Sequence, residues 1–69
     1  MTLNKIIQAI YGLDTELARL EKHYGLLSVD FYHLYKASEL EQSRDFIQWM
    51  GYYEAKLERE AHYRERLGL

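Results

Sequence analysis

The sequence predicts an all-α fold, in which two long antiparallel helices are joined by a short connecting helix. Three observations support this prediction. The 69 residues include no proline, and the four glycines stand apart from one another. Apolar and aromatic residues recur at alternating spacings of three and four, which is typical of a helix face packed on another helix. Serine, threonine and glycine stand where such helices would begin and end.

The first helix is expected from about residue 3 to residue 24. Thr2 can cap its start, and Gly25 stands where a left-handed residue would end it. Lys22 and His23 suit the negative end of the helix dipole. Seven residues at spacings of 3, 4, 3, 4, 3 and 4 form a heptad seam: Leu3, Ile6, Ile10, Leu13, Leu17, Leu20 and Tyr24.

Two further helices are expected in a single helical domain that covers residues 1–69. The short one covers about residues 28–37, with Ser28 as its N-cap. The last helix runs to about residue 67, and its start is open between Ser38, which has capping-box spacing with Glu41, and Ser43. Its apolar stripe comprises Phe46, Ile47, Trp49, Met50, Tyr52, Tyr53, Leu57 and Ala61.

These two apolar stripes are too extensive for one hairpin to enclose, so we expect part of them to meet another chain. The simplest closed arrangement is a twofold dimer that forms a four-helix bundle, although a partner protein would serve equally. The aromatic residues of the short helix are the candidates for partner contact: Phe31, Tyr32 and Tyr35. The expected self-association seam comprises Leu3, Ile6, Ile10, Leu13, Leu17, Leu20, Phe46, Trp49, Met50, Tyr53 and Leu57.

The composition of the chain argues against several classes of function. The absence of cysteine excludes disulfides, thiolate zinc sites and cysteine nucleophiles. A net charge of -2 and a pI of about 5.9 argue against direct binding to nucleic acid. No apolar run has the length of a membrane span, and the N-terminus lacks the pattern of a signal peptide. We therefore expect a cytoplasmic protein that does not bind membranes.

The sequence contains only weak indications of a catalytic or metal-binding site. Asp30 with His33, and Glu58 with His62, each place a carboxylate and an imidazole on one helix face, but no carboxylate lies within the apolar seams where a bundle would hold a metal. The serines stand at expected helix caps, and no glycine-rich phosphate loop is present. We expect no catalytic residue, no metal site and no cofactor; a metal-dependent bundle enzyme is the least favoured class.

Four short patterns run through about residues 17–57: Leu20-Glu21-x-x-Tyr24-Gly25, Ser28-x-x-Phe31-Tyr32-x-x-Tyr35, Glu39-Leu40 and Ser43-x-Asp45-Phe46-x-x-Trp49. Together they resemble a group of short helical proteins of bacteria and archaea that are often encoded beside a toxin gene and are interpreted as antitoxins. The sequence departs from that pattern at Ser38, His33 and Gln48, where glycine, an acidic residue and glutamate would be expected.

This resemblance implies a non-catalytic protein that binds and neutralises a toxin protein through its helices. The alternative is a homo-oligomeric helical scaffold or adaptor without a toxin partner.

Overall fold

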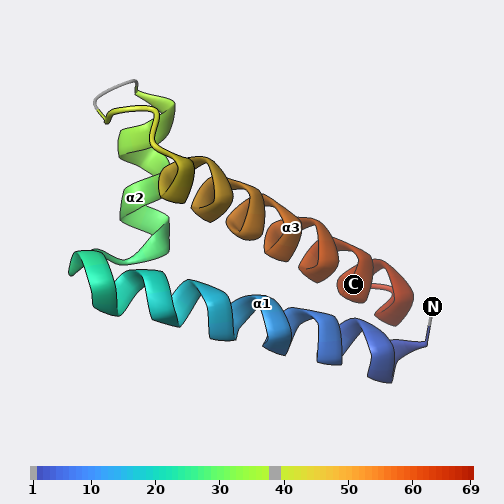
Figure 1. Cartoon of the computed structure of the whole chain (residues 1–69). Coiled ribbons are helices and arrows are strands. Elements are labelled where there is room, and N and C mark those ends of the chain that lie inside the picture. The colour runs from blue at the N-terminus through green and yellow to red at the C-terminus, as the bar shows by residue number, and fades with distance from the viewer. Residues whose placement is uncertain (1, 38–39) are drawn as a thin grey trace.

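The computed structural model describes residues 2–37 and 40–69, and its three helices confirm the all-helical fold class. Helix α1 spans Leu3–Tyr24, α2 spans Ser28–Lys36 and α3 spans Arg44–Leu67 (Figure 1). The bounds expected for α1 and α2, and for α3 with a start at Ser43, differ from these by no more than one residue at either end. No strand occurs in the described ranges.

The two long helices lie side by side, and α2 rises from one end of the pair (Figure 1). The last residue of α1, Tyr24, stacks on Trp49 near the start of α3, with ring centroids 5.6 Å apart. Further along, Asp14 of α1 pairs with Lys56 of α3, with 2.8 Å between the carboxylate oxygen and Nζ. The marked N- and C-termini lie at the end of the pair away from α2 (Figure 1).

The first and last helices begin at side-chain caps that the sequence predicts. The Thr2 hydroxyl accepts the backbone N–H of Lys5 at 3.2 Å, and the Ser43 hydroxyl accepts that of Phe46 at 3.1 Å. Of the two starts considered for the last helix, the structure therefore has the one at Ser43. The alternative start, Ser38, and its neighbour Glu39 lie outside the described residues.

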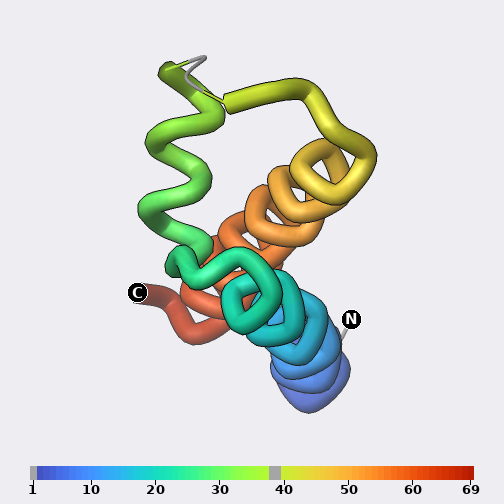
Figure 2. Tube along the Cα trace, turned by 60° about the vertical axis from the view of Figure 1, so that its left-hand side comes forward, coloured from blue at the N-terminus to red at the C-terminus, as the bar shows by residue number. Residues whose placement is uncertain are grey.

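A left-handed glycine ends α1, also as predicted. Gly25 has a φ of 68°, and its N–H donates to the carbonyl of Glu21 at 2.8 Å. A side chain at this φ would be strained, since L-residues with a Cβ rarely adopt it. The turn lets α2 leave the axis of α1, and residues 40–43 lead back to the start of α3 (Figure 2).

The start of α2 corrects one prediction. Ser28 is the first helical residue rather than the cap, and the N-cap position belongs to Leu27, whose side chain cannot accept a hydrogen bond. The missing acceptor comes from α1, because the carboxylate of Glu21 accepts the backbone N–H of Ser28 at 2.8 Å. A carboxylate is well suited to this place, since the start of a helix carries partial positive charge.

The core lies where the three helices meet. Phe31 of α2 and Trp49 of α3 are fully buried and stack in parallel, with ring centroids 3.9 Å apart and an interplanar angle of 3°. Leu17 and Leu20 of α1 complete the buried cluster. Ile6 is buried separately near the opposite end of α1. Four of the five buried hydrophobic residues in the described ranges therefore lie at the α2 end.

Candidate interaction surfaces

Much of the expected self-association seam packs within a single chain. Four of its residues are buried there, and six more are half-buried. Only Leu57 is an exposed member of the seam, at 41%. The buried members are not accessible to a second copy while the chain keeps this conformation, and association through the remainder stays a prediction. The buried members are Ile6, Leu17, Leu20 and Trp49, and the half-buried ones are Leu3, Ile10, Leu13, Phe46, Met50 and Tyr53.

The three expected partner-contact residues fall into two groups. Phe31 is a core residue, and its contact with a partner would require α2 to detach. Tyr32 and Tyr35 are half-buried, with hydroxyls near the surface. The Tyr32 hydroxyl donates to the carboxylate of Glu54 at 3.2 Å, and that of Tyr35 donates to the side-chain oxygen of Gln42 at 2.8 Å. Only these two of the three are thus placed where a partner can reach them.

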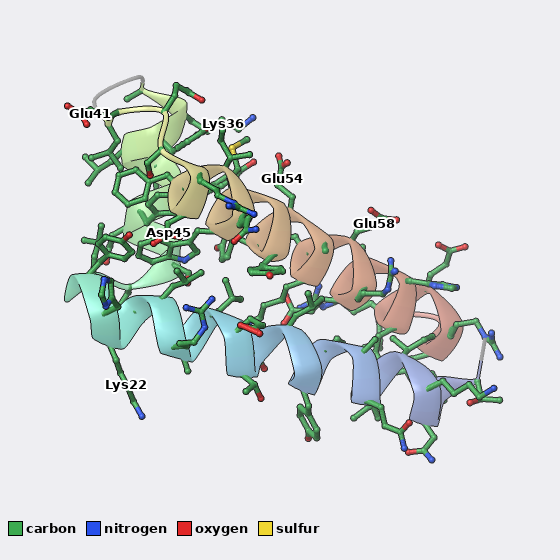
Figure 3. The ribbon with its side chains drawn as sticks, in the orientation of Figure 1. Lys22, Lys36, Glu41, Asp45, Glu54 and Glu58 are labelled. Atoms are coloured by element: carbon green, nitrogen blue, oxygen red, sulfur yellow. The ribbon has the colours of Figure 1, made fainter. Side chains whose placement is uncertain are left out.

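Tyr32 belongs to a surface patch that joins α2 to α3. Its ring lies 5.0 Å from that of Tyr53, and the Nζ of Lys36 lies 5.5 Å from the Tyr32 ring centroid. The same Nζ is 3.8 Å from a carboxylate oxygen of Glu54, and the labelled side chains of Lys36 and Glu54 lie on the outer side of the bundle (Figure 3). We call these four residues the Tyr32 patch. The carboxylate of Glu54 thus meets both the Tyr32 hydroxyl and the Lys36 ammonium group.

A groove of about 370 Å³ lies between α1, α3 and the start of α2. Leu27 and Val29 line it and are exposed at 60% and 45%. Tyr53 lines the groove and also belongs to the Tyr32 patch, so that the two surfaces are continuous. We call this the α2 groove. Its lining residues are Asp14, Leu17, Glu21, Leu27, Ser28, Val29, Tyr53 and Lys56.

Three charged residues line the α2 groove: Glu21 and the ion pair of Asp14 with Lys56. The hydrogen bond from Lys56 to the Asp14 carboxylate raises the pKa of Lys56 above its ordinary value, against a smaller opposing effect of burial. The ammonium group therefore stays protonated and bound to its partner at neutral pH. A protonated lysine is neither a nucleophile nor a base.

A second, smaller groove of about 230 Å³ lies between α1 and α3 near the chain termini. We call it the terminal groove. Its apolar side comes mainly from α1, where Tyr11 is 67% exposed, and its charged side comes from α3. The lining residues are Ile7, Ile10, Tyr11, Glu60, Tyr63 and Arg64.

The junction between α1 and α3 carries one further polar contact. The phenol of Tyr24 donates to the carboxylate of Asp45, which is labelled in Figure 3. This hydrogen bond raises the pKa of Tyr24 above its ordinary value. The contact links the end of α1 to the first turn of α3.

In the ranges that the structure covers, no three histidine or acidic side chains gather as metal ligands would. Neither Asp30 with His33 nor Glu58 with His62 is joined by a third ligand there. Within the same ranges, no helix combines the length and apolar character that crossing a membrane requires.

Sequence reasoning missed the charged residues that line the α2 groove. Asp14 and Lys56 are far apart in the sequence, and nothing in the spacing of either residue indicates their pairing. Glu21 stands seven residues before Ser28, on another helix, so local capping rules do not reach it.

Comparisons with protein-family models, curated proteins and solved structures found no match for this chain.

Proposed function

We propose that this chain is a non-catalytic protein–protein interaction module. In its most concrete form it is an antitoxin-like cytoplasmic protein that binds and neutralises a toxin protein and dimerises through its two long antiparallel helices. The observation that carries the proposal is the exposure of Leu27 and Val29 at 60% and 45% beside the α2 groove. Aliphatic side chains around a hollow surface are a common feature of protein-binding sites.

The partner surface in this proposal combines the α2 groove with the Tyr32 patch. Tyr53 contacts Tyr32 and lines the groove, so one partner helix or loop can cover both. Tyrosine suits this role because it offers a large contact area at a small cost in side-chain entropy. The ion pair of Asp14 with Lys56 supplies a polar group of each sign within the groove, which fixes the orientation of a bound segment.

A co-expression assay tests the antitoxin proposal. The open reading frame beside the gene for this chain is expressed alone and together with the chain, and growth is measured. We expect growth arrest by the neighbouring product alone, relief by the chain, and a complex of the two purified proteins. A neighbouring product that neither arrests growth nor binds the chain would exclude the antitoxin function.

Two substitutions test the surface. Val29→Asp places a charge on the apolar rim of the groove and should abolish relief of growth arrest, because the charge would be buried in the complex. Asp30→Asn is the matched control, since residue 30 is also exposed on α2 but does not line the groove. Loss of relief by the control variant alone would place the toxin-binding surface elsewhere.

A second candidate function is a homo-oligomeric scaffold without a toxin. The specific observation in its favour is the exposed pair Leu57 and Leu67 on α3, at 41% and 44%. Both leucines lie on the half of α3 that is remote from α2. The scaffold needs only the self-association surface, whereas the antitoxin also needs the α2 groove.

A further inference from the structure

The second half of α3 has an unusual order of charges. From two to five residues on either side of His62, residues at equal distances are complementary: both members of a pair are leucine, or one is acidic and the other basic. The pair next to His62, Ala61 with Tyr63, carries no charge. Opposite charges at mirrored positions are what two copies of one helix need when they pair in opposite directions. The mirrored pairs are Leu57 with Leu67, Glu58 with Arg66, Arg59 with Glu65, and Glu60 with Arg64.

Two of these pairs share one face of the helix. Leu57, Glu60, Arg64 and Leu67 follow one another at spacings of 3, 4 and 3, which places them along a single stripe of an α-helix. The two leucines at the ends of the stripe are both exposed. The stripe therefore presents an apolar residue, an acid, a base and an apolar residue in order.

The stripe borders the terminal groove. Glu60 and Arg64 line this groove together with Tyr11, which is 67% exposed, and two isoleucines of α1. Neither Glu60 nor Arg64 takes part in an ion pair within the part of the chain that the structure describes. Arg64 is exposed and Glu60 is half-buried, and the charge of Glu60 also raises the pKa of Lys56 on the same helix. Both charges can therefore meet a second molecule beside an apolar hollow.

We propose that a second copy of this chain docks on this stripe, with the two α3 helices antiparallel about a twofold axis level with residue 62. Glu60 then faces Arg64 of the partner subunit, and Leu57 faces Leu67 of the partner subunit. The terminal grooves of the two copies meet beside the axis, and Tyr11 is covered. The inference rests on the dimerisation within the proposed function and specifies its surface and direction.

The order of charges along the stripe indicates which molecule docks on it. If the two α3 helices ran parallel and in register, Glu60 would face a glutamate and Arg64 an arginine, which repel each other. An unrelated partner would give no reason for the two halves of residues 57–67 to mirror each other. Of the two ways to pair two copies of α3, the antiparallel one satisfies both charges and both leucines of the stripe at once.

Charge reversal with mixing tests the arrangement. Glu60→Arg alone and Arg64→Glu alone each create two like-charge contacts per dimer, so the dissociation constant measured by sedimentation should rise at least about tenfold. An equimolar mixture of the two variants restores both ion pairs, because one copy then carries two arginines and the other two glutamates. The mixture should therefore form a heterodimer about as tight as the unaltered dimer.

Lys22→Glu is the matched control. Lys22 points away from the helix pair (Figure 3), so its reversal should leave the dissociation constant unchanged. Circular dichroism verifies that each variant keeps its helices. A heterodimer in the mixture, with weak self-association of each variant alone, supports the antiparallel α3 interface.

The contradicting results separate this inference from the proposed function. A dimer that tolerates both reversals, or a mixture that stays dissociated, would overturn the α3 interface while leaving dimerisation intact. A chain that is monomeric at every concentration would overturn dimerisation itself, while toxin binding would still be decided by the growth assay.

Discussion

The indole of Trp49 donates a 2.9 Å hydrogen bond from Nε1 to the hydroxyl of Ser28, while its ring stacks on Phe31. Both partners belong to α2, so one side chain of α3 supplies the polar and the apolar contact that hold the short helix in place. Because the indole is fully buried, its N–H has no access to water and depends on Ser28. The position of α2, and hence the shape of the α2 groove, follows from this contact.

Ser28→Ala should lower the free energy of unfolding by about 1–3 kcal/mol, because it leaves the buried indole N–H without an acceptor. The same substitution in a Trp49→Phe background should cost less than about half as much, since phenylalanine has no N–H to satisfy. Urea denaturation of the four chains forms a double-mutant cycle that measures the coupling. Equal costs of Ser28→Ala in the two backgrounds would show that the hydrogen bond does not stabilise the fold.

Glu21→Ala should destabilise α2 by about 0.5–2 kcal/mol, the range expected for the loss of an N-cap acceptor. Glu21→Gln keeps an acceptor but loses the favourable charge, so its effect should be smaller. Amide hydrogen exchange at Ser28 and along α2 reports the change. Gln8→Ala, at an exposed position of α1, is the control and should leave the exchange of α2 unaltered.

Leu17→Glu should unfold the chain rather than only dissociate a dimer. Leu17 is buried against the aromatic core within one chain, so an unpaired charge there should cost at least about 3 kcal/mol. From the sequence alone, the same substitution would be expected to break only the oligomer. Circular dichroism distinguishes the two outcomes, with Ala18→Glu at the exposed neighbouring position as the control. A helical Leu17→Glu monomer would instead favour the seam as a surface between copies.

The free energy of unfolding should fall at alkaline pH, because Lys56 then loses the proton on which its ion pair with Asp14 depends. The pKa of Lys56 is raised in the folded chain above 10.5, so the folded state holds the proton more tightly than the unfolded state. The stabilisation is complete below the unfolded pKa and is lost as the pH rises through the folded one.

A comparison of variants isolates the contribution of this ion pair to the pH dependence of stability. Tyr24 titrates in the same direction, because its pKa is also raised, so the comparison uses a Tyr24→Phe background. In that background, the urea midpoint should fall more steeply between about pH 9 and about pH 12 with Asp14 present than with Asp14→Asn. Identical slopes would mean that the ion pair does not contribute to stability.

Structural features that depend on neighbouring residues along the chain could be predicted from the sequence. Thr2, Gly25 and Ser43 end or begin helices through hydrogen bonds three or four residues away, which local rules describe well. The spacing of apolar residues likewise located α1, because helix periodicity is a property of consecutive residues.

Features that depend on another helix were not predictable in this way. Ser28 has the composition of a cap, but its hydroxyl accepts from Trp49 and its N–H is bound by Glu21. Phe31 looks like a partner-contact residue in a short helix, yet the fold stacks it on Trp49. Periodicity shows which residues share a face, but it does not show whether the same chain or a second copy covers that face.

Sedimentation of the unaltered chain across a dilution series tests the account most directly, because both the proposed bundle and the α3 interface require self-association. We predict a helical species of twice the 8.3 kDa chain mass at micromolar concentration that dissociates on dilution. A folded species of 8.3 kDa at every concentration would contradict it.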